Sequence, residues 1–224
     1  MKSDSVTIAG QDVPIDYIIS QRNKRITVRY CVKKQSIVVR MPQKTKKTLA
    51  LELILNNTPY FEKFIVAKRI LRPGDCINLL GQEYALLGQK SFRNYCEIQG
   101  DQIISYYITG LNLNENVKSI ARRMLLTYLQ TQVPVRAAQI SETFNEVSVK
   151  NMMSRWGSCS SQRNLNFSLN LAFVPLKCLE YVIVHEVCHL KYMNHSQKFW
   201  DLVGQLFPDY KKAREILKKS IITL

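Results

Sequence analysis

All three histidines of the chain, His185, His189 and His195, fall within eleven consecutive residues. The first two form the pattern His-Glu-x-x-His, in which Glu186 directly follows the first histidine. In an α-helix, residues four apart lie on the same face, so His185 and His189 can bind one metal ion together. Glu186 would then lie beside the ion and could accept a proton from an attacking water. The pattern predicts the site of a zinc hydrolase.

A catalytic zinc ion takes three ligands from the protein and leaves its fourth position for water. The helix can supply two, so His195 must come back toward the ion after a reversal of the chain. Residues 192–194 offer such a reversal, because Asn194 tolerates left-handed backbone angles that end a helix. We therefore expect one Zn2+ ion bound by His185, His189 and His195, with Glu186 as the general base. Cys188 lies at a different angle around the helix, and we interpret it as a small buried residue.

The composition is that of a folded protein: 46% of the 224 residues are hydrophobic and 22% are charged. No apolar run is long enough for a transmembrane helix, and the N-terminus lacks the apolar core of a signal peptide. We therefore expect a cytoplasmic protein without a membrane partner. The six cysteines contain no C-x-x-C pair, which argues against a cysteine-based structural zinc site.

The formal net charge of +15 is concentrated in the first third of the chain. Residues 1–75 carry 15 Lys and Arg against 6 Asp and Glu. Such a surplus indicates an anionic partner, with nucleic acid as the first candidate and nucleotides as the second. A solvated basic surface without a specific partner is the alternative interpretation.

The elements before residue 110 are expected to be short strands around one helical segment. Alternating polarity predicts strands, and glycine-containing turns predict hairpins. Pro59 should kink or split the helical pattern. The sequence shows no internal repeat. The expected elements are a strand pair at 25–30 and 36–41, a helix at 47–68, and hairpins at 76–87 and 94–108, with turns at Gly81-Gln82 and Gly100-Asp101.

A change of composition at residues 109–114 marks a linker or the approach to a helix. Beyond it we expect an amphipathic helix through Tyr128 and a second, short helix beginning at Pro134. Strands follow at 147–150 and 165–169. Pro175 should open the helix that carries His185, and a final helix should start at about Ser196.

Several of these residues together resemble the YgjP-like metallopeptidase family, which is related to the WLM and SprT-like zincins. The resemblance is carried by His185-Glu186-Val187-Cys188-His189-Leu190, Asn194-His195-Ser196 and Phe199-Trp200, with Arg155–Ser160 and Leu165-Asn166 upstream. Val187-Cys188 stands where the family more often has Leu-Ala, which should not disturb the ligands. Weaker similarity extends forward to residues 25–42.

The expected elements indicate an α+β fold, in which a basic, β-rich N-terminal region, residues 1–112, precedes a C-terminal part, residues 113–224. The resemblance implies that this C-terminal part is a small zincin-like metallopeptidase domain with the H-E-x-x-H helix under a small sheet. It also implies metal binding by the three histidines and general-base catalysis by Glu186. Some relatives act on proteins attached to DNA, and a nucleotide pyrophosphatase activity has been attributed to one YgjP-type member.

The segment Arg155–Ser160 allows two interpretations. Arg155 or nearby backbone amides could stabilise an oxyanion or contact substrate. Alternatively the segment is a turn, with Trp156 packed on the metal helix and Gly157 permitting the backbone to bend. We favour the structural interpretation, and we interpret Phe199 and Trp200 as core residues.

The function we expect is a zinc-dependent metallopeptidase acting on a protein or peptide, near nucleic acid if the basic region docks there. The first alternative is a metal-dependent nucleoside triphosphate pyrophosphatase, although no G-x-x-x-x-G-K-[ST] loop is present. The second is a non-enzymatic nucleic-acid-binding module with structural zinc. The sequence does not indicate the oligomeric state.

Overall fold

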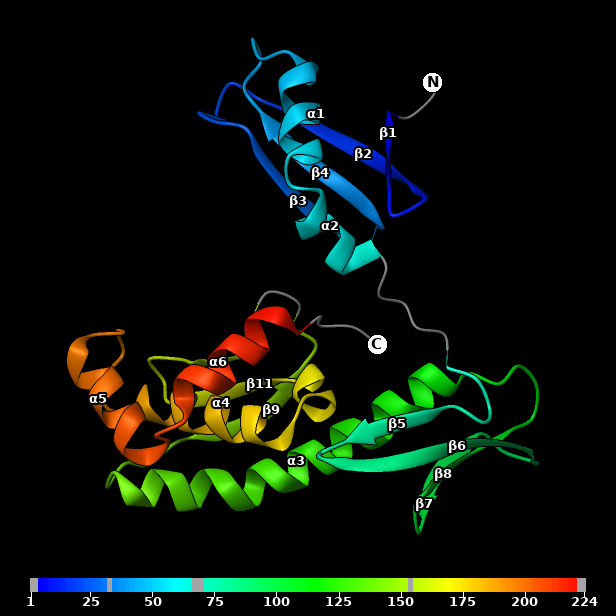
Figure 1. The fold of residues 1–224 in the computed structure, drawn as a ribbon, viewed down its shortest axis with the longest axis vertical. Coiled ribbons are helices and arrows are strands. Elements are labelled where there is room, and N and C mark those ends of the chain that lie inside the picture. The colour runs from blue at the N-terminus through cyan, green and yellow to red at the C-terminus, as the bar shows by residue number, and fades with distance from the viewer. Residues whose placement is uncertain (1–3, 32–33, 66–70, 153–154, 221–224) are drawn as a thin grey trace. The chain divides into compact units, whose positions relative to one another are not determined.

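The computed structural model describes residues 4–31, 34–65, 71–152 and 155–220 (Figure 1). The chain forms two compact units, an N-terminal unit, Met1–Arg69, and a C-terminal unit, Ile70–Ser220. Both combine sheets with helices, in agreement with the expected α+β class. Within the described ranges, no helix is both long enough and apolar enough to cross a membrane.

The N-terminal unit is a four-stranded sheet with two helices packed against one face (Figure 1). Ile37, Val39 and Met41 alternate along a central strand and are fully buried with Ile54 and Phe61 of the helices. The strand expected at residues 36–41 is confirmed, and its alternate residues contribute to the core. The elements are β1 (Ser5–Ile8), β2 (Gln11–Ile19), β3 (Thr27–Cys31), β4 (Ser36–Met41), α1 (Lys47–Leu55) and α2 (Thr58–Ile65), and the strand order is β1-β2-β4-β3.

Pro59 divides the helical segment as expected. Proline has no N–H to donate, so the hydrogen-bond ladder of α1 cannot continue through it. The chain turns between the two helices, where the Thr58 hydroxyl donates to the carbonyl of Leu55 at 2.6 Å. The end of the predicted helix, residues 66–68, lies outside the described residues.

A second four-stranded sheet opens the C-terminal unit and has the same topology as the first. In each sheet the first two strands form an antiparallel hairpin, the second pairs in parallel with the fourth, and the third pairs antiparallel with the fourth. The hairpins expected at Gly81-Gln82 and Gly100-Asp101 are both present. The strands are β5 (Cys76–Leu79), β6 (Gln82–Lys90), β7 (Tyr95–Gln99) and β8 (Gln102–Tyr107), in the order β5-β6-β8-β7.

The two sheets also share residues at their turns, so the expectation of no internal repeat is wrong. Gly10-Gln11-Asp12 leads into β2 and Gly81-Gln82-Glu83 leads into β6. Both glycines adopt a positive φ, 76° and 86°, which few other residues accept at low cost. At the same spacing beyond them come Ser20-Gln21-Arg22-Asn23 and Ser91-Phe92-Arg93-Asn94. The strands in between have similar burial patterns but few identical residues, which is why residue identity does not reveal the repeat.

Equivalent hydrogen bonds support this repeat. The backbone N–H of Ser20 donates to the carbonyl of Met41 at 3.2 Å, and that of Ser91 donates to the carbonyl of Tyr107 at 2.9 Å. Each bond ties the end of the second strand to the end of the fourth. The chain therefore contains two copies of one four-stranded module, one in each unit.

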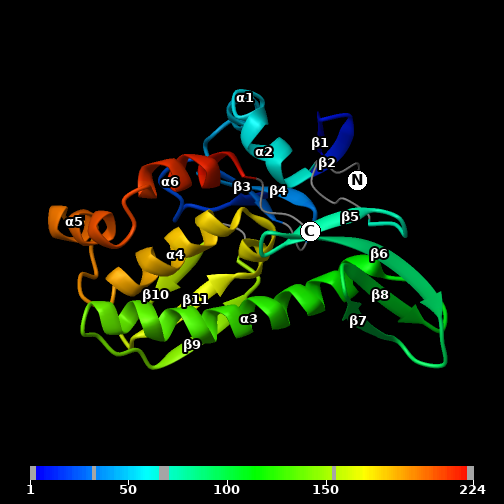
Figure 2. The same cartoon turned by 60° about the horizontal axis from the view of Figure 1, so that its bottom comes forward.

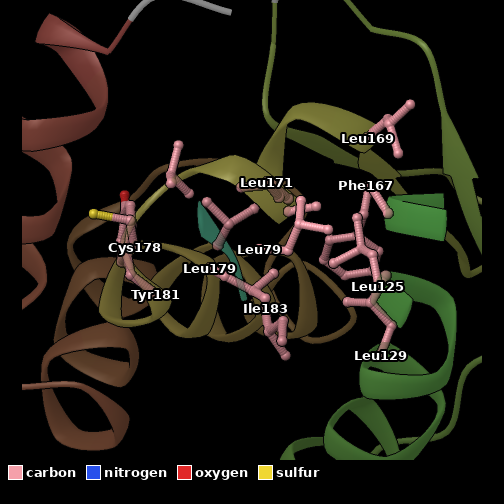
Figure 3. Close-up of a cluster of buried hydrophobic side chains, with 14 of the residues drawn as sticks. Leu79, Leu125, Leu129, Phe167, Leu169, Leu171, Cys178, Leu179, Tyr181 and Ile183 are labelled. Atoms are coloured by element: carbon pink, nitrogen blue, oxygen red, sulfur yellow. The ribbon is translucent and has the colours of Figure 1, made fainter. Parts of the chain in front are cut away.

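Helix α3 (Leu113–Gln139) runs from the second sheet to the part of the C-terminal unit that carries the histidines (Figure 2). Leu125 and Leu129 of α3 lie in the same buried cluster as Phe167, Leu179 and Ile183 (Figure 3). The cluster fixes the histidine-bearing helix against α3 and a small sheet. The elements of this part are β9 (Glu146–Lys150), β10 (Gly157–Cys159), β11 (Asn164–Ser168), the 3-10 helix η1 (Leu169–Phe173), α4 (Leu176–Cys188), α5 (Gln197–Leu206) and α6 (Tyr210–Lys219), with strand order β10-β11-β9.

Pro134 was expected to begin a second helix, but it lies inside α3. The buried face of α3 continues across the proline, with Val133 before it and Ala137 after it. Pro134 itself is exposed, and so is Gln130, whose carbonyl loses its helical partner to the proline. Water can satisfy that carbonyl, so packing of the buried face carries the helix through.

Residues 71–112 pack with the histidine-bearing part of the chain. Leu79, Leu86 and Ile103 of the second sheet belong to the same core cluster as α3 and α4. The compact units divide between Arg69 and Ile70, earlier than the boundary at 112/113 that composition suggests. The segment at 109–114 is the approach to α3, not a linker between units.

Candidate metal centre

Helix α4 carries His185 near its C-terminal end. Pro175 is its N-cap, and Leu179 and Ile183 are buried on its apolar side, so the helix is held in the core. His189 is the C-cap residue and still has helical backbone angles, φ −68° and ψ −19°. The expected spacing of one helical turn between the two histidines is therefore present.

The chain then turns back and brings His195 to the first two histidines. The N–H of Tyr192 donates to the carbonyl of Cys188 at 3.0 Å, which closes the turn after α4. Asn194 does not adopt the left-handed backbone that the sequence analysis expected of it. Its side-chain oxygen instead accepts from the N–H of Ser196 at 3.3 Å, just before α5. Asn194 thus shapes the turn through its side chain.

The ligand atoms of His185, His189 and His195 all lie within 4.8 Å of one another. The Nε2 atoms of His185 and His195 are 3.1 Å apart. Two nitrogens bound to one tetrahedral zinc ion at about 2.05 Å would be separated by about 3.4 Å. The spacing and the chemistry of these donors fit one zinc ion and leave a fourth position open.

Hydrogen bonds on the outer side of two rings orient the Nε2 atoms toward one another. His189 Nδ1 donates to the carbonyl of Tyr192 at 2.9 Å, which leaves its Nε2 lone pair free for a metal. His185 Nδ1 lies 3.4 Å from the hydroxyl of Tyr181. Burial, together with the two neighbouring histidines, lowers the pKa of His185 to about 3. Burial also lowers the pKa of His189, so both rings favour the neutral form that binds metals.

Two aromatic rings of α5, Phe199 and Trp200, pack against the histidines. Phe199, fully buried, stacks on His189 with ring centroids 4.5 Å apart. Trp200 stacks on His195 with ring centroids 5.5 Å apart. The guanidinium carbon of Arg214 lies over the same Trp200 ring, 5.0 Å from its centroid. The interpretation of Phe199 as a core residue is correct. Both rings also restrict the orientation of the imidazoles they contact.

Glu186 directly follows His185 on α4 and has only 5% of its surface exposed. Burial raises its pKa to about 8, and the positive charge of Arg155 opposes this increase. Gly157 of β10 lies directly against the carboxylate: a Cβ atom at this position would be 2.5 Å from Oε1 of Glu186. Gly157 therefore allows a close approach of strand and carboxylate, whereas the sequence analysis interpreted it as permitting a backbone bend.

The Arg155–Ser160 segment is not the turn that the structural interpretation expected, because Gly157–Cys159 form the strand β10. Trp156 is partly buried against the core, and its carbonyl accepts from the N–H of Ser168 at 2.8 Å. Cys188 is fully buried, as expected, and burial raises the pKa of its thiol to about 12.

Sequence reasoning missed two contacts at this centre. Tyr181 lies four residues before His185, and the same helical spacing that pairs the histidines could have indicated it. The contact of Gly157 with Glu186 has no comparable signal, because the two residues lie on elements that are distant in sequence.

The sequence profile of the YgjP-like metallopeptidase domain matches residues 24–220, which is most of the chain. The chain belongs to the YgjP-like family. The resemblance found in the sequence is therefore confirmed, and membership implies a metal-dependent hydrolase. A search of curated proteins found no match to the chain.

For this YgjP-like protein, we expect His195→Ala to weaken zinc binding by at least about 100-fold, because one of three donors is lost. The side chain is exposed, so the fold should survive the change. Competition with a chromophoric chelator measures the affinity, and circular dichroism checks the fold. Lys191→Ala, an exposed change in the same turn, is the control and should bind zinc normally. Unaltered zinc affinity of His195→Ala would mean that another group is the third ligand.

Proposed function

We propose that this protein is a zinc-dependent peptidase in which His185, His189 and His195 hold the ion and Glu186 is the general base. The observation that carries the proposal is the buried carboxylate of Glu186, which directly follows His185, one of three converging imidazoles. A carboxylate in such a place has a free-energy cost that a purely structural role does not explain, and perturbed acids of this kind cluster at functional sites.

Zinc at the three histidines would supply Lewis acidity, which acidifies a water molecule and polarises the scissile carbonyl. Glu186 would take the proton of the attacking water and later give it to the leaving amine. The pKa of Glu186 falls when a cation occupies the neighbouring histidines, because opposite charge favours the ionised form. The carboxylate would then be available as a base at neutral pH.

The edge strand β10 supports a peptide substrate. Trp156 accepts from Ser168 and Ser160 donates to Asn164, so the backbone groups of these β10-side residues point toward β11. In an antiparallel pair the alternate residues, here Gly157 and Cys159, direct their backbone N–H and C=O to the other side. An extended peptide can pair with such an edge, and here it would run past Glu186.

Metal removal and restoration test this proposal. The zinc-loaded protein is assayed for cleavage of a mixed peptide library and, in the same preparation, for pyrophosphate release from nucleoside triphosphates. We expect peptide cleavage that falls to background after chelation and returns with stoichiometric zinc. Pyrophosphate release without peptide cleavage would favour the nucleotide hydrolase, and zinc binding with neither activity would favour a structural metal.

A further inference from the structure

The strongest charge feature of the chain lies in the N-terminal unit. Residues 22–47 contain ten lysines and arginines and no aspartate or glutamate. This stretch includes β3, β4 and the loops on either side of them. A basic run of this density would repel itself unless it were spread out or neutralised.

The fold gathers six of these cations at one end of the sheet. The last residues of β2 and β4 are neighbours, and Thr27, at the start of β3, pairs with Arg40. The loops at 20–26 and 42–46 therefore leave the sheet at the same end. Gln21 Nε2 donates to Gln43 Oε1 at 3.1 Å, which joins the loops directly. We call this surface the basic end; its cations are Arg22, Lys24, Arg25, Arg40, Lys44 and Lys46.

The cations of the basic end are exposed, and no acidic side chain of the described residues forms an ion pair with them. Among the described residues, the ion pairs of the N-terminal unit are Lys34 with Asp16 and Lys47 with Asp4, and neither includes a cation of the basic end. Helix α1 also begins here, with no acidic residue in its first turn and no side-chain cap. The partial positive charge of its free N–H groups adds to that of the loops.

The second copy of the module shows that the fold does not require this charge. Residues 76–112 form the same topology with two Lys or Arg and three Asp or Glu. At the end equivalent to the basic end, the loop after β6 carries a fully exposed Phe92 and a single cation, Arg93. The charge is therefore a property of the first copy's surface and is not required by the topology of the module.

We propose that the basic end binds the phosphodiester backbone of a nucleic acid and so brings the hydrolase unit to it. Clustered, unpaired Lys and Arg on exposed loops gain affinity from the release of counterions that surround a polyphosphate. The basic end offers exposed charges, so we expect it to contact the phosphate backbone and to recognise little base sequence. This role is independent of zinc and of Glu186.

The test compares two variants of the full-length protein from which equal charge has been removed. The first variant, Lys24→Gln/Arg25→Gln/Lys44→Gln/Lys46→Gln, lacks four cations of the basic end. The control, Lys90→Gln/Arg93→Gln/Lys150→Gln/Lys177→Gln, lacks four exposed cations of the C-terminal unit. Fluorescence anisotropy with a labelled mixed-sequence oligonucleotide, single-stranded and duplex, gives the affinity at several salt concentrations.

We expect the basic-end variant to lose about tenfold or more in affinity, and the slope of log K against log salt to fall by about 3. The control should bind nearly as the wild type does. Absence of wild-type binding, or an equal loss in both variants, would overturn the proposal. Tighter binding of labelled polyglutamate than of the oligonucleotide would also overturn it and indicate an acidic protein partner. Because Glu186→Gln and zinc-free protein should bind equally well, failure here is distinguishable from failure of the peptidase proposal.

Discussion

Glu186→Gln is expected to bind zinc as the wild type does and to lose peptide cleavage by about 10²–10⁴-fold in kcat. Glutamine has the shape of glutamate and fits the same buried space against Gly157. It cannot accept a proton from water, so the variant removes the base and leaves the metal ligands in place. Zinc content by mass spectrometry and cleavage rates on the same preparations measure the two properties.

Glu180→Gln, on the same helix α4, is the matched control. Its side chain accepts from the Tyr128 hydroxyl at 3.3 Å, away from the histidines, and the change should leave cleavage almost unaltered. If Glu186→Gln retained the wild-type rate with full zinc, Glu186 would not be the base. If it lost zinc, the carboxylate would have to be assigned a role in metal binding instead.

Gly157→Ala is expected to lower kcat by about 10²-fold while zinc binding persists. The added methyl group would lie 2.5 Å from Oε1, 2.6 Å from Cγ and 2.8 Å from Cδ of Glu186. Such distances are impossible between non-bonded atoms, so the carboxylate must move away. A displacement of about 1 Å in a reacting group can cost a factor of 10² in rate.

Gly204→Ala provides the control for this substitution. A Cβ at Gly204 in α5 would meet Tyr210 at 3.6 Å, an ordinary contact, and alanine suits a helix better than glycine. Cleavage by Gly204→Ala should therefore be normal, with equal or higher thermal stability. Wild-type kcat in Gly157→Ala would contradict the role of this glycine in positioning Glu186.

Much of the site could be predicted from the sequence because its geometry is local. His185 and His189 are one helical turn apart, and the helical spacing of the apolar residues around them predicts α4. The return of His195 was predictable from the count of ligands that zinc needs and from the short turn available. The strands of both four-stranded modules were predicted in part from alternating polarity, although β1 and β2 were not.

Other features depend on which distant elements pack together, and periodicity carries no such information. The contact of Gly157 with Glu186 joins a strand to a helix in the folded chain, and the continuation of α3 through Pro134 depends on the core beneath it. The repeated module became visible once equal topology aligned Gly10 with Gly81 and Ser20 with Ser91. The sequence by itself determined which residues could hold a metal, because ligand type and helical spacing are local. Only the tertiary structure decided how Glu186 is buried and where the cations gather, because both arise from contacts between segments that are far apart in the chain.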